Sequence, residues 1–223
     1  MNSHDRGVLI GMILGDGCIK PKRTVLKDGT PTVYYEFVAG HSSKQEAYIT
    51  HKRDVFHSIM GGKLPKIHSR NFMLGGKEHT ELRFSRQHKY FKLLYNWTYP
   101  KGRKTYSRRM LDYLNPKGIA FWFMDDGSIH KNKNKLGNVS SVEMRISTYC
   151  TEQEVDCLIE YFKSVWNIVA KKRHHKKGDS WYLAFNTQES KKLELLIQPY
   201  MTESMYYKLP STWLTRAQRA VIE

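Results

Sequence analysis

Two continuous apolar segments, each ending in aspartate and glycine, dominate the hydrophobic pattern of the chain. They are "LIGMILGDG" at residues 9–17 and "IAFWFMDDG" at residues 119–127. Their length and lack of polar interruption predict two buried helices. After each comes alternating apolar and polar sequence typical of a strand, "TVYYEFVAG" and "SVEMRISTY". An amphipathic helix is then predicted in each part, "KQEAYITHKRDVFHSIM" and "EQEVDCLIEYFKSVW". The pattern therefore runs in the same order twice.

The rest of each part continues this order. Two more strands are predicted from "KIHSRNFML" with "TELRFSRQ", and from "IVAKKRHH" with "SWYLAFNT"; closing helices lie around "HKYFKLLYNW" and "ESKKLELLIQPY". The first strand of each part, in "PKRTVL" and "HKNKNKLG", shows little alternation and is the weaker prediction. Capping boxes are expected where Ser43 precedes Glu46 and Thr151 precedes Glu154.

This repeated order predicts an internal duplication. We expect an α/β (α+β) fold of two αββαββα halves. The segment "TYPKGRKTYSRRMLDYLNPKG" contains proline, glycine and clustered charge and suits a linker. The expected division is a first half at residues 1–98, a linker at 99–117 and a second half at 118–223.

The charge balance indicates a polyanionic partner. The chain has 37 Lys and Arg against 21 Asp and Glu, a formal charge of +16. Neutralising phosphates releases counterions and favours binding. Ribosomal, membrane-surface and nuclease proteins share this balance. The 14 Tyr, 9 Phe and 5 Trp favour a packed globule over a disordered basic tail.

Several classes of protein are disfavoured. The cysteines Cys18, Cys150 and Cys157 are too few and too badly spaced for a zinc site or a disulfide framework, which favours a reducing compartment. No apolar run approaches a membrane span, and the N-terminal residues lack the pattern of a signal peptide. We therefore expect a protein of the cytoplasm or an organelle matrix, wherever the host genome lies, that is not secreted and has no membrane partner. No glycine-rich phosphate loop is present.

The aspartates at the predicted helix ends are the candidate chemistry. Gly11 and Gly15 lie four apart, on one helix face, and would let another helix approach closely, while Gly17 suits a left-handed C-terminal residue. A carboxylate at the negative end of a helix is unfavourable. If the two helices pack side by side, Asp16 and Asp126 converge, and a divalent cation between them would relieve their repulsion. Oxygen ligands favour Mg²⁺. A single Asp-Gly could be a turn, but two at corresponding points favour the metal.

These motifs resemble the two signature helices of the LAGLIDADG homing endonucleases, most closely the subgroup whose second motif reads "WFMDDG". The segments "RKTYSRRMLDYLNP" and "IQPYMTESMYYKLP" also match that subgroup, so the resemblance covers nearly the whole chain. It implies a monomer of two pseudo-twofold-related halves whose sheets form a saddle over double-stranded DNA. It further implies Mg²⁺-dependent cleavage of both strands at a long, asymmetric target, leaving short 3′ overhangs.

The resemblance also implies roles for individual residues. Asp16 and Asp126 would bind two or three divalent ions shared between the halves. The backbone carbonyls of Gly15 and Asp125 are candidate additional ligands.

Two lysines match active-site positions of the subgroup. They are Lys104 and Lys208, which follow their aspartates by 88 and 82 residues, as expected for a pseudo-symmetric pair. A lysine near the scissile phosphate could stabilise developing charge or help to position water, although an ordinary phosphate contact or a solvated charge is the alternative. The chain departs from the family pattern at Leu14, where some members have an acid. It also departs at Phe121, which replaces the first packing glycine of the second motif.

Specificity would come from side chains on the strands, reading base edges in the major groove or contacting phosphates. The basic cluster at residues 171–177 is expected in a hairpin near DNA. The candidate DNA-binding residues are Lys22, Arg23, Arg70, Arg83, Arg86, Lys131, Lys133, Arg145, Lys172, Arg173, Lys176 and Gln188.

Two alternatives keep the same fold without requiring DNA cleavage. One is an intron maturase, for which intron RNA would be a partner. The other is a non-cleaving DNA-binding protein, against which the retention of both Asp16 and Asp126 argues.

Overall fold

The computed structural model describes residues 1–175 and 179–212. The first half contains helix α1 (Ser3–Leu14), strands β1 (Cys18–Val25) and β2 (Pro31–Ser42), helix α2 (Glu46–Met60), strands β3 (His68–Leu74) and β4 (Lys77–Gln87) and helix α3 (Phe91–Thr98). The second contains α5 (Pro116–Asp126), β5 (Gly127–Lys133), β6 (Val139–Cys150), α6 (Glu152–Trp166), β7 (Lys171–His174), β8 (Trp181–Phe185) and α7 (Thr187–Ile197). The predicted αββαββα order is confirmed in both halves, including the two weakly patterned first strands.

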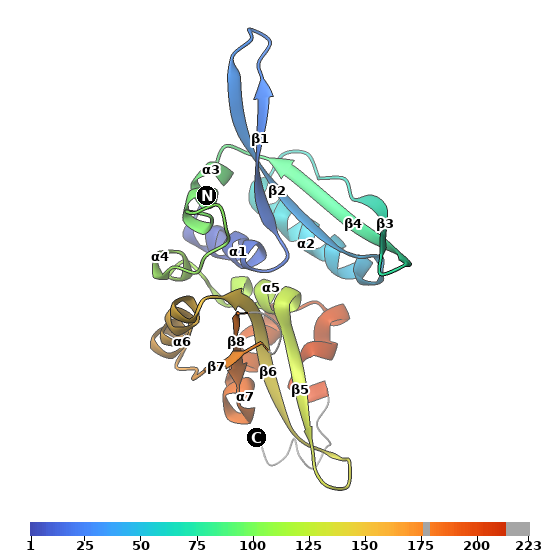
Figure 1. The fold of residues 1–223 in the computed structure, drawn as a ribbon, viewed down its shortest axis with the longest axis vertical. Helices are drawn as coiled ribbons and strands as arrows, with labels where there is room; N and C mark the ends of the chain where they lie inside the picture. The colour runs from blue at the N-terminus through green and yellow to red at the C-terminus, as the bar shows by residue number, and fades with distance from the viewer. Residues whose placement is uncertain (176–178, 213–223) are drawn as a thin grey trace.

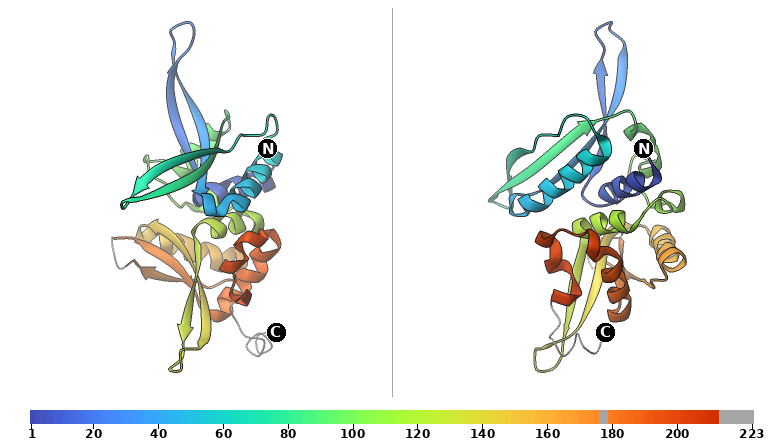
Figure 2. Two further views of the ribbon diagram at one scale, coloured as in Figure 1. Left: turned by 90° about the vertical axis from the view of Figure 1, so that its right-hand side faces the viewer. Right: turned by 180° about the vertical axis from the view of Figure 1, so that it is seen from behind.

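Each half has one antiparallel four-stranded sheet. The strand orders are β1-β2-β4-β3 and β5-β6-β8-β7, so the sheets have the same topology. The halves lie one above the other with α1 and α5 between them (Figure 1). Seen from the side, the strands of both halves lie toward one side of the molecule, and α2 and α7 lie toward the other (Figure 2). One face of each sheet is therefore covered by helices.

Glycines bring α1 and α5 into close contact. A Cβ atom on Gly11 would overlap the carbonyl of Gly118, and one on Gly118 would overlap the carbonyl of Gly7. The predicted close approach of the two motif helices is confirmed, but the second half contributes Gly118 instead of a glycine at position 121. Phe121 is fully buried and stacks on His51 of α2, with ring centroids 5.7 Å apart. The aromatic side chain thus contacts the first half's α2.

Two local predictions at the ends of helices are wrong. Helix α1 ends at Leu14 with Gly15 as its C-cap, and Gly17 is not among the residues with positive φ. Position 17 requires glycine for a steric reason, because a Cβ there would overlap the carbonyl of Met12. The expected Ser43–Glu46 capping box is absent: Ser42 caps a short 3₁₀ turn at Ser43–Gln45, and α2 begins with no side-chain cap.

The second-half capping box is confirmed. The Thr151 hydroxyl accepts from the backbone N–H of Glu154, whose carboxylate accepts from the N–H of Thr151. The expected linker contains a short helix, α4 (Arg108–Leu111), whose apolar residues Met110 and Leu111 are buried. The division at 99–117 stays a prediction.

The buried side chains form one continuous core around the two motif helices. In the first half, the ring of Phe37 stacks on Phe56 with centroids 4.7 Å apart; in the second half, Trp122 stacks on Phe162 at 6.3 Å. Within residues 1–175 and 179–212, every helix is too short or too polar to cross a membrane.

Candidate active site

Packing of α1 against α5 brings the two motif aspartates together at one end of the helix pair. Asp16 follows the C-cap of α1, and Asp126 is the last residue of α5. Burial raises the pKa of Asp126 to about 7, and the charges of Asp16 and Asp125 add to this rise. Burial and the charge of Asp125 also raise the pKa of Asp16, although 46% of its side chain remains exposed. The predicted convergence of two mutually repelling carboxylates is thus present.

Lys104 and Lys208 lie at equivalent places in the two halves. The Lys104 Nζ donates to the carbonyl of Gly15 at 2.6 Å, and the Lys208 Nζ donates to the carbonyl of Asp125 at 3.0 Å. Each ammonium therefore caps the negative end of one motif helix. Burial lowers the pKa of both lysines, and the neighbouring aspartates oppose that shift. The carbonyls proposed as additional metal ligands are the acceptors of these two lysines, which leaves one lone pair on each.

Both lysines oppose the raised pKa of the two motif aspartates, but burial is the larger effect. At Asp16 the largest opposing charge is that of Lys52, followed by Lys208 and Lys104, and at Asp126 it is that of Lys104. The Lys208 ammonium interacts most strongly with Asp125, whose carbonyl accepts its hydrogen bond.

A buried network around the Asp125 side chain was not predicted. Its Oδ2 accepts from the Lys52 Nζ at 2.6 Å and from the backbone N–H of Asp16 at 2.9 Å, and its Oδ1 accepts from the Tyr48 hydroxyl at 2.6 Å. The side chains of Lys52 and Asp125 are both 0% exposed. A signal was present in the sequence, because Lys52 lies four residues from both Tyr48 and Phe56, on the apolar stripe of α2. A lysine on such a stripe is almost never buried without a partner.

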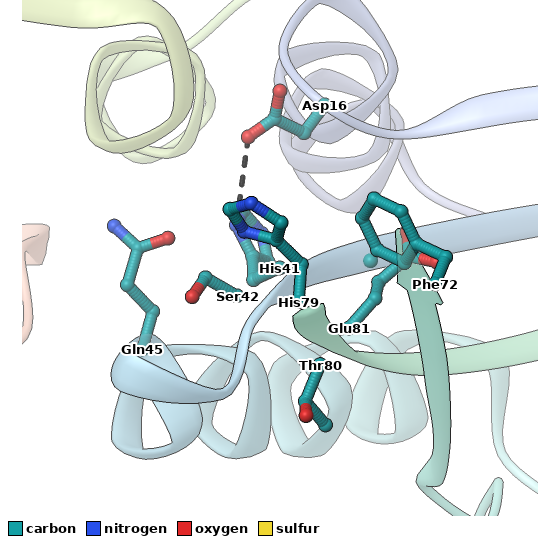
Figure 3. A pocket seen from close by; sticks show the side chains of 9 residues that line it. Asp16, His41, Ser42, Gln45, Phe72, His79, Thr80 and Glu81 are labelled. Atoms are coloured by element: carbon teal, nitrogen blue, oxygen red, sulfur yellow. Dashed lines mark ion pairs between the residues drawn. The ribbon is translucent and has the colours of Figure 1, made fainter. Parts of the chain in front are cut away.

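His41 connects this network to Asp16. Its Nδ1 lies 3.5 Å from the Asp16 Oδ2, and its Nε2 lies 3.5 Å from the Asp125 Oδ1. The Lys52 Nζ approaches the same Nε2 at 3.4 Å. Burial and the Lys52 charge lower the pKa of His41 to about 4, so the ring is neutral at pH 7. Asp16 and His41 border a pocket whose lining includes Gln45, Phe72 and Glu81 (Figure 3).

The chemistry of Asp16 and Asp126 suits a divalent cation. Among the described residues, the donor atoms that lie within 4.8 Å of one another belong to Asp16, His41 and Asp125 and do not include Asp126. However, the Asp125 carboxylate is already neutralised by Lys52. Within the described residues, neither Asp16 nor Asp126 forms an ion pair with lysine or arginine. Both have raised pKa values, which a cation would relieve, and both offer the oxygen ligands that Mg²⁺ prefers.

Part of the predicted basic set lies on the strand face away from the helices. Side chains alternate between the two faces of a strand, and cross-strand partners share a face. In the first sheet, Arg83 is opposite Gly40 and pairs with Glu81 at 2.9 Å. In the second, Arg145 pairs with Glu143 at 2.7 Å. The residues that this pattern assigns to the open face are Lys22, Arg70, Arg83, Arg145 and Arg173.

Other candidates do not lie on that face. Arg86 is opposite the buried Phe37 and donates to the carbonyls of Gly61 and Lys63. Its side chain is therefore hydrogen-bonded to the loop after α2. Lys172 forms ion pairs with Glu152 and Asp156 of α6, at 2.7 and 3.0 Å, on the helix-covered side.

Four more candidates are placed as follows. Arg23 alternates with Lys22 and so lies on the opposite side of the β1–β2 ribbon, while Lys131 is opposite the buried Val142. Lys133 follows an irregularity in strand pairing, and Gln188 is an exposed residue of α7 and not of a strand. Lys176 lies outside the described residues.

Two helix-end carboxylates between two duplicated antiparallel sheets with basic open faces define a protein of two related halves whose candidate site lies at their junction. The chain belongs to the LAGLIDADG DNA endonuclease family, whose family model matches residues 6–193.

Several relatives and solved structures are similar to the chain. The "Probable intron-encoded endonuclease 1" of Wickerhamomyces canadensis is 29% identical over 205 residues, which is 90% of this chain and 81% of that protein. "Protein RecA" of Mycolicibacterium chitae is 27% identical over 207 residues. The chain spans 45% of that relative's length. The homing endonuclease I-WcaI bound to its DNA recognition sequence superposes with a TM-score of 0.71 at 23% identity, covering 93% of this chain and 86% of that one. This last likeness confirms the fold.

Proposed function

We propose that the protein is a site-specific DNA homing endonuclease that makes a Mg²⁺-dependent double-strand break with short 3′ overhangs at a long, asymmetric target. The observation that carries the proposal is the meeting of Asp16 and Asp126 at one end of the α1–α5 pair, with Lys104 and Lys208 on the adjoining helix ends. The intron-encoded endonuclease of W. canadensis and the DNA-bound I-WcaI structure support DNA as substrate.

The aspartates and the lysines of the site would have different roles. Asp16 and Asp126 would hold Mg²⁺, which when bound activates water and neutralises charge on the scissile phosphate. Within the described residues, Lys104 and Lys208 donate to backbone carbonyls and not to carboxylates, so each can bring positive charge to a phosphate oxygen. Preorganised charge of this kind stabilises the transition state because it needs no rearrangement during the reaction.

The two open strand faces would bind the DNA. Arg70 and Arg83 on the first sheet, and Arg145 and Arg173 on the second, occupy different registers and have different neighbours. Two unlike surfaces in one chain support an asymmetric target. Because one chain supplies both aspartates and both lysines, a monomer suffices for cutting two strands. The protein would act in whichever compartment holds the host genome.

The test is cleavage of a randomised target library in Mg²⁺, in Ca²⁺ and in EDTA. We expect linear products with short 3′ overhangs in Mg²⁺ alone. Asp16→Asn and Asp126→Asn are expected to abolish double-strand cleavage while DNA binding survives. Normal cutting by either variant would remove these carboxylates from the mechanism. Because several relatives are named as intron-encoded, binding to structured intron RNA is measured in parallel; tight RNA binding without DNA cleavage would favour a maturase.

A further inference from the structure

The pseudo-twofold relation between the halves can be followed residue by residue along the strands. Asp16 and Asp126 each lie two residues before Cys18 and Ser128, whose partners on the next strand are Val38 and Arg145. Three residues beyond these partners come His41 in the first half and Thr148 in the second. The two halves therefore present different side chains beside their motif aspartates.

The second half departs from the first at this position. The pairing of β6 with β8 shifts between Ser147 and Cys150, and Tyr149 has a positive φ of 47°. Such an irregularity redirects side chains. The Thr148 hydroxyl donates to the carbonyl of Trp181 at 2.7 Å, and no described histidine pairs with Asp126.

The helix that follows shows the same difference. Phe56 in α2 and Phe162 in α6 are equivalent fully buried residues, so Lys52 corresponds to Leu158. The buried Lys52 ammonium of the first half thus has an apolar counterpart in the second. The carboxylate that pairs with Lys52 belongs to Asp125, and the position equivalent to Asp125 in the first motif is Gly15. Within residues 1–175 and 179–212, the network of Lys52, Asp125 and His41 has no second copy, and it adjoins Asp16.

The contacts of His41 favour one position for the ring proton. Nε2 lies 3.4 Å from the Lys52 Nζ and 3.5 Å from the Asp125 Oδ1. An ammonium group can only donate, and Lys52 already neutralises Asp125, so we assign Nε2 as the acceptor. In the neutral ring the proton is then on Nδ1, the nitrogen that faces the Asp16 Oδ2 at 3.5 Å. A metal-binding carboxylate is oriented by the hydrogen bonds that it accepts from neighbouring groups.

We infer that His41 and Lys52 are positioning residues for Asp16 alone, so that the two halves of the site are inequivalent and one DNA strand depends on this pair more than the other. The inference rests on the proposed endonuclease function. It adds to that function that cleavage of the two DNA strands differs in its sensitivity to loss of His41 and Lys52. A protein without this pair is expected to nick the DNA instead of cutting both strands.

The first experiment compares His41→Phe, which removes both nitrogens, with His41→Asn, whose amide keeps a donor near the place of Nδ1. Plasmid carrying the cleaved site is labelled on one strand at a time, and the rate constant of each strand is measured in Mg²⁺. We expect His41→Phe to slow one strand about 10- to 100-fold more than the other, so that nicked plasmid accumulates. His41→Asn is expected to restore part of the lost rate. Thr148→Val, at the equivalent position, is the control and should leave the strand ratio unchanged.

The second experiment uses the metal-free protein. The ¹⁵N resonances of the His41 ring are expected to show Nδ1 protonated and Nε2 unprotonated. The double variant Lys52→Met with Asp125→Asn removes the pair without leaving a buried charge and should lose this preference.

Equal slowing of both strands by His41→Phe, or protonation at Nε2 in the wild-type protein, would overturn the inference. A mere loss of folded protein lowers both strand rates together and so leaves their ratio unchanged. If the wild-type protein cuts neither strand, the proposed function fails, while the ring resonances still decide the arrangement of His41 and Lys52.

Discussion

Replacing Asp126 by asparagine should stabilise the metal-free protein while it abolishes cleavage. The structure raises the pKa of this carboxyl from 3.8 to about 7, through burial and the charges of Asp16 and Asp125. A shift of about 3 units at about 1.36 kcal/mol per unit sets a ceiling of about 4 kcal/mol on the cost of ionising Asp126 in the folded state. Because its side chain is partly exposed and therefore screened, we expect about 1 to 2 kcal/mol.

The pH at which this cost appears follows from proton linkage. The unfolded chain loses the Asp126 proton near pH 3.8, and the folded protein keeps it until about pH 7. Between these values the folded state binds more protons, so the free energy of unfolding falls as pH rises from about 4 to about 7. The asparagine variant lacks this contribution. The two proteins should therefore differ little near pH 4 and most above pH 7.

Urea unfolding in EDTA from pH 5 to pH 8 measures the difference. Asp28→Asn is the control, because hydrogen bonds from Thr30 lower the pKa of that exposed carboxyl, which is therefore ionised in both states from pH 5 to pH 8; its profile should run parallel to that of the wild type. Adding Mg²⁺ at pH 8 should stabilise the wild-type protein, since a ligand bound by the folded state alone raises stability with its concentration. The Asp126→Asn variant should gain less stability from Mg²⁺. Parallel pH profiles for Asp126→Asn and the wild type would refute the electrostatic account of the site.

Three other predictions concern catalysis, packing and DNA binding. Because Lys104 bonds to the end of α1 and Lys208 to the end of α5, Lys104→Met and Lys208→Met should slow opposite DNA strands; slowing of the same strand by both variants, measured on strand-labelled plasmid, would contradict this. Gly11→Ala places a Cβ against the Gly118 backbone and should cost about 3 kcal/mol or more in urea unfolding; a smaller loss would mean that the helices can separate freely. Neutralising the basic residues of the segment 171–177 should weaken binding to all DNA sequences and flatten the salt dependence, whereas loss at a single base position would contradict a phosphate contact.

The duplicated fold could be predicted because its signal is repeated. Two apolar helices, each followed by alternating strands and an amphipathic helix, leave few arrangements open. The strand in "PKRTVL" has weak alternation, yet β1 pairs with β2 along its whole length, from Cys18 opposite Val38 to Val25 opposite Pro31. Pairing with a strongly patterned neighbour compensates for a weak local pattern.

The faces of the strands were predicted less well, although the sequence carried part of the signal. In "TELRFSRQ", Leu82, Phe84 and Arg86 alternate, which places Arg86 on the apolar side with Phe84 and separates it from Arg83. The position of Lys172 depends on α6, which supplies Glu152 and Asp156 from elsewhere in the chain. Only the folded structure brings those charges together.

The asymmetry of the active site has a steric cause in the same pair of motifs. The first motif reads Gly15-Asp16 and the second reads Asp125-Asp126. A Cβ atom on Gly15 would overlap the carboxylate of Asp125, which fills the space that this glycine leaves open. Two acids at these equivalent positions would therefore collide at the interface of α1 and α5. Duplication supplies the paired aspartates, but close packing allows only one half to carry the additional carboxylate, and Lys52 and Tyr48 surround it on one side alone.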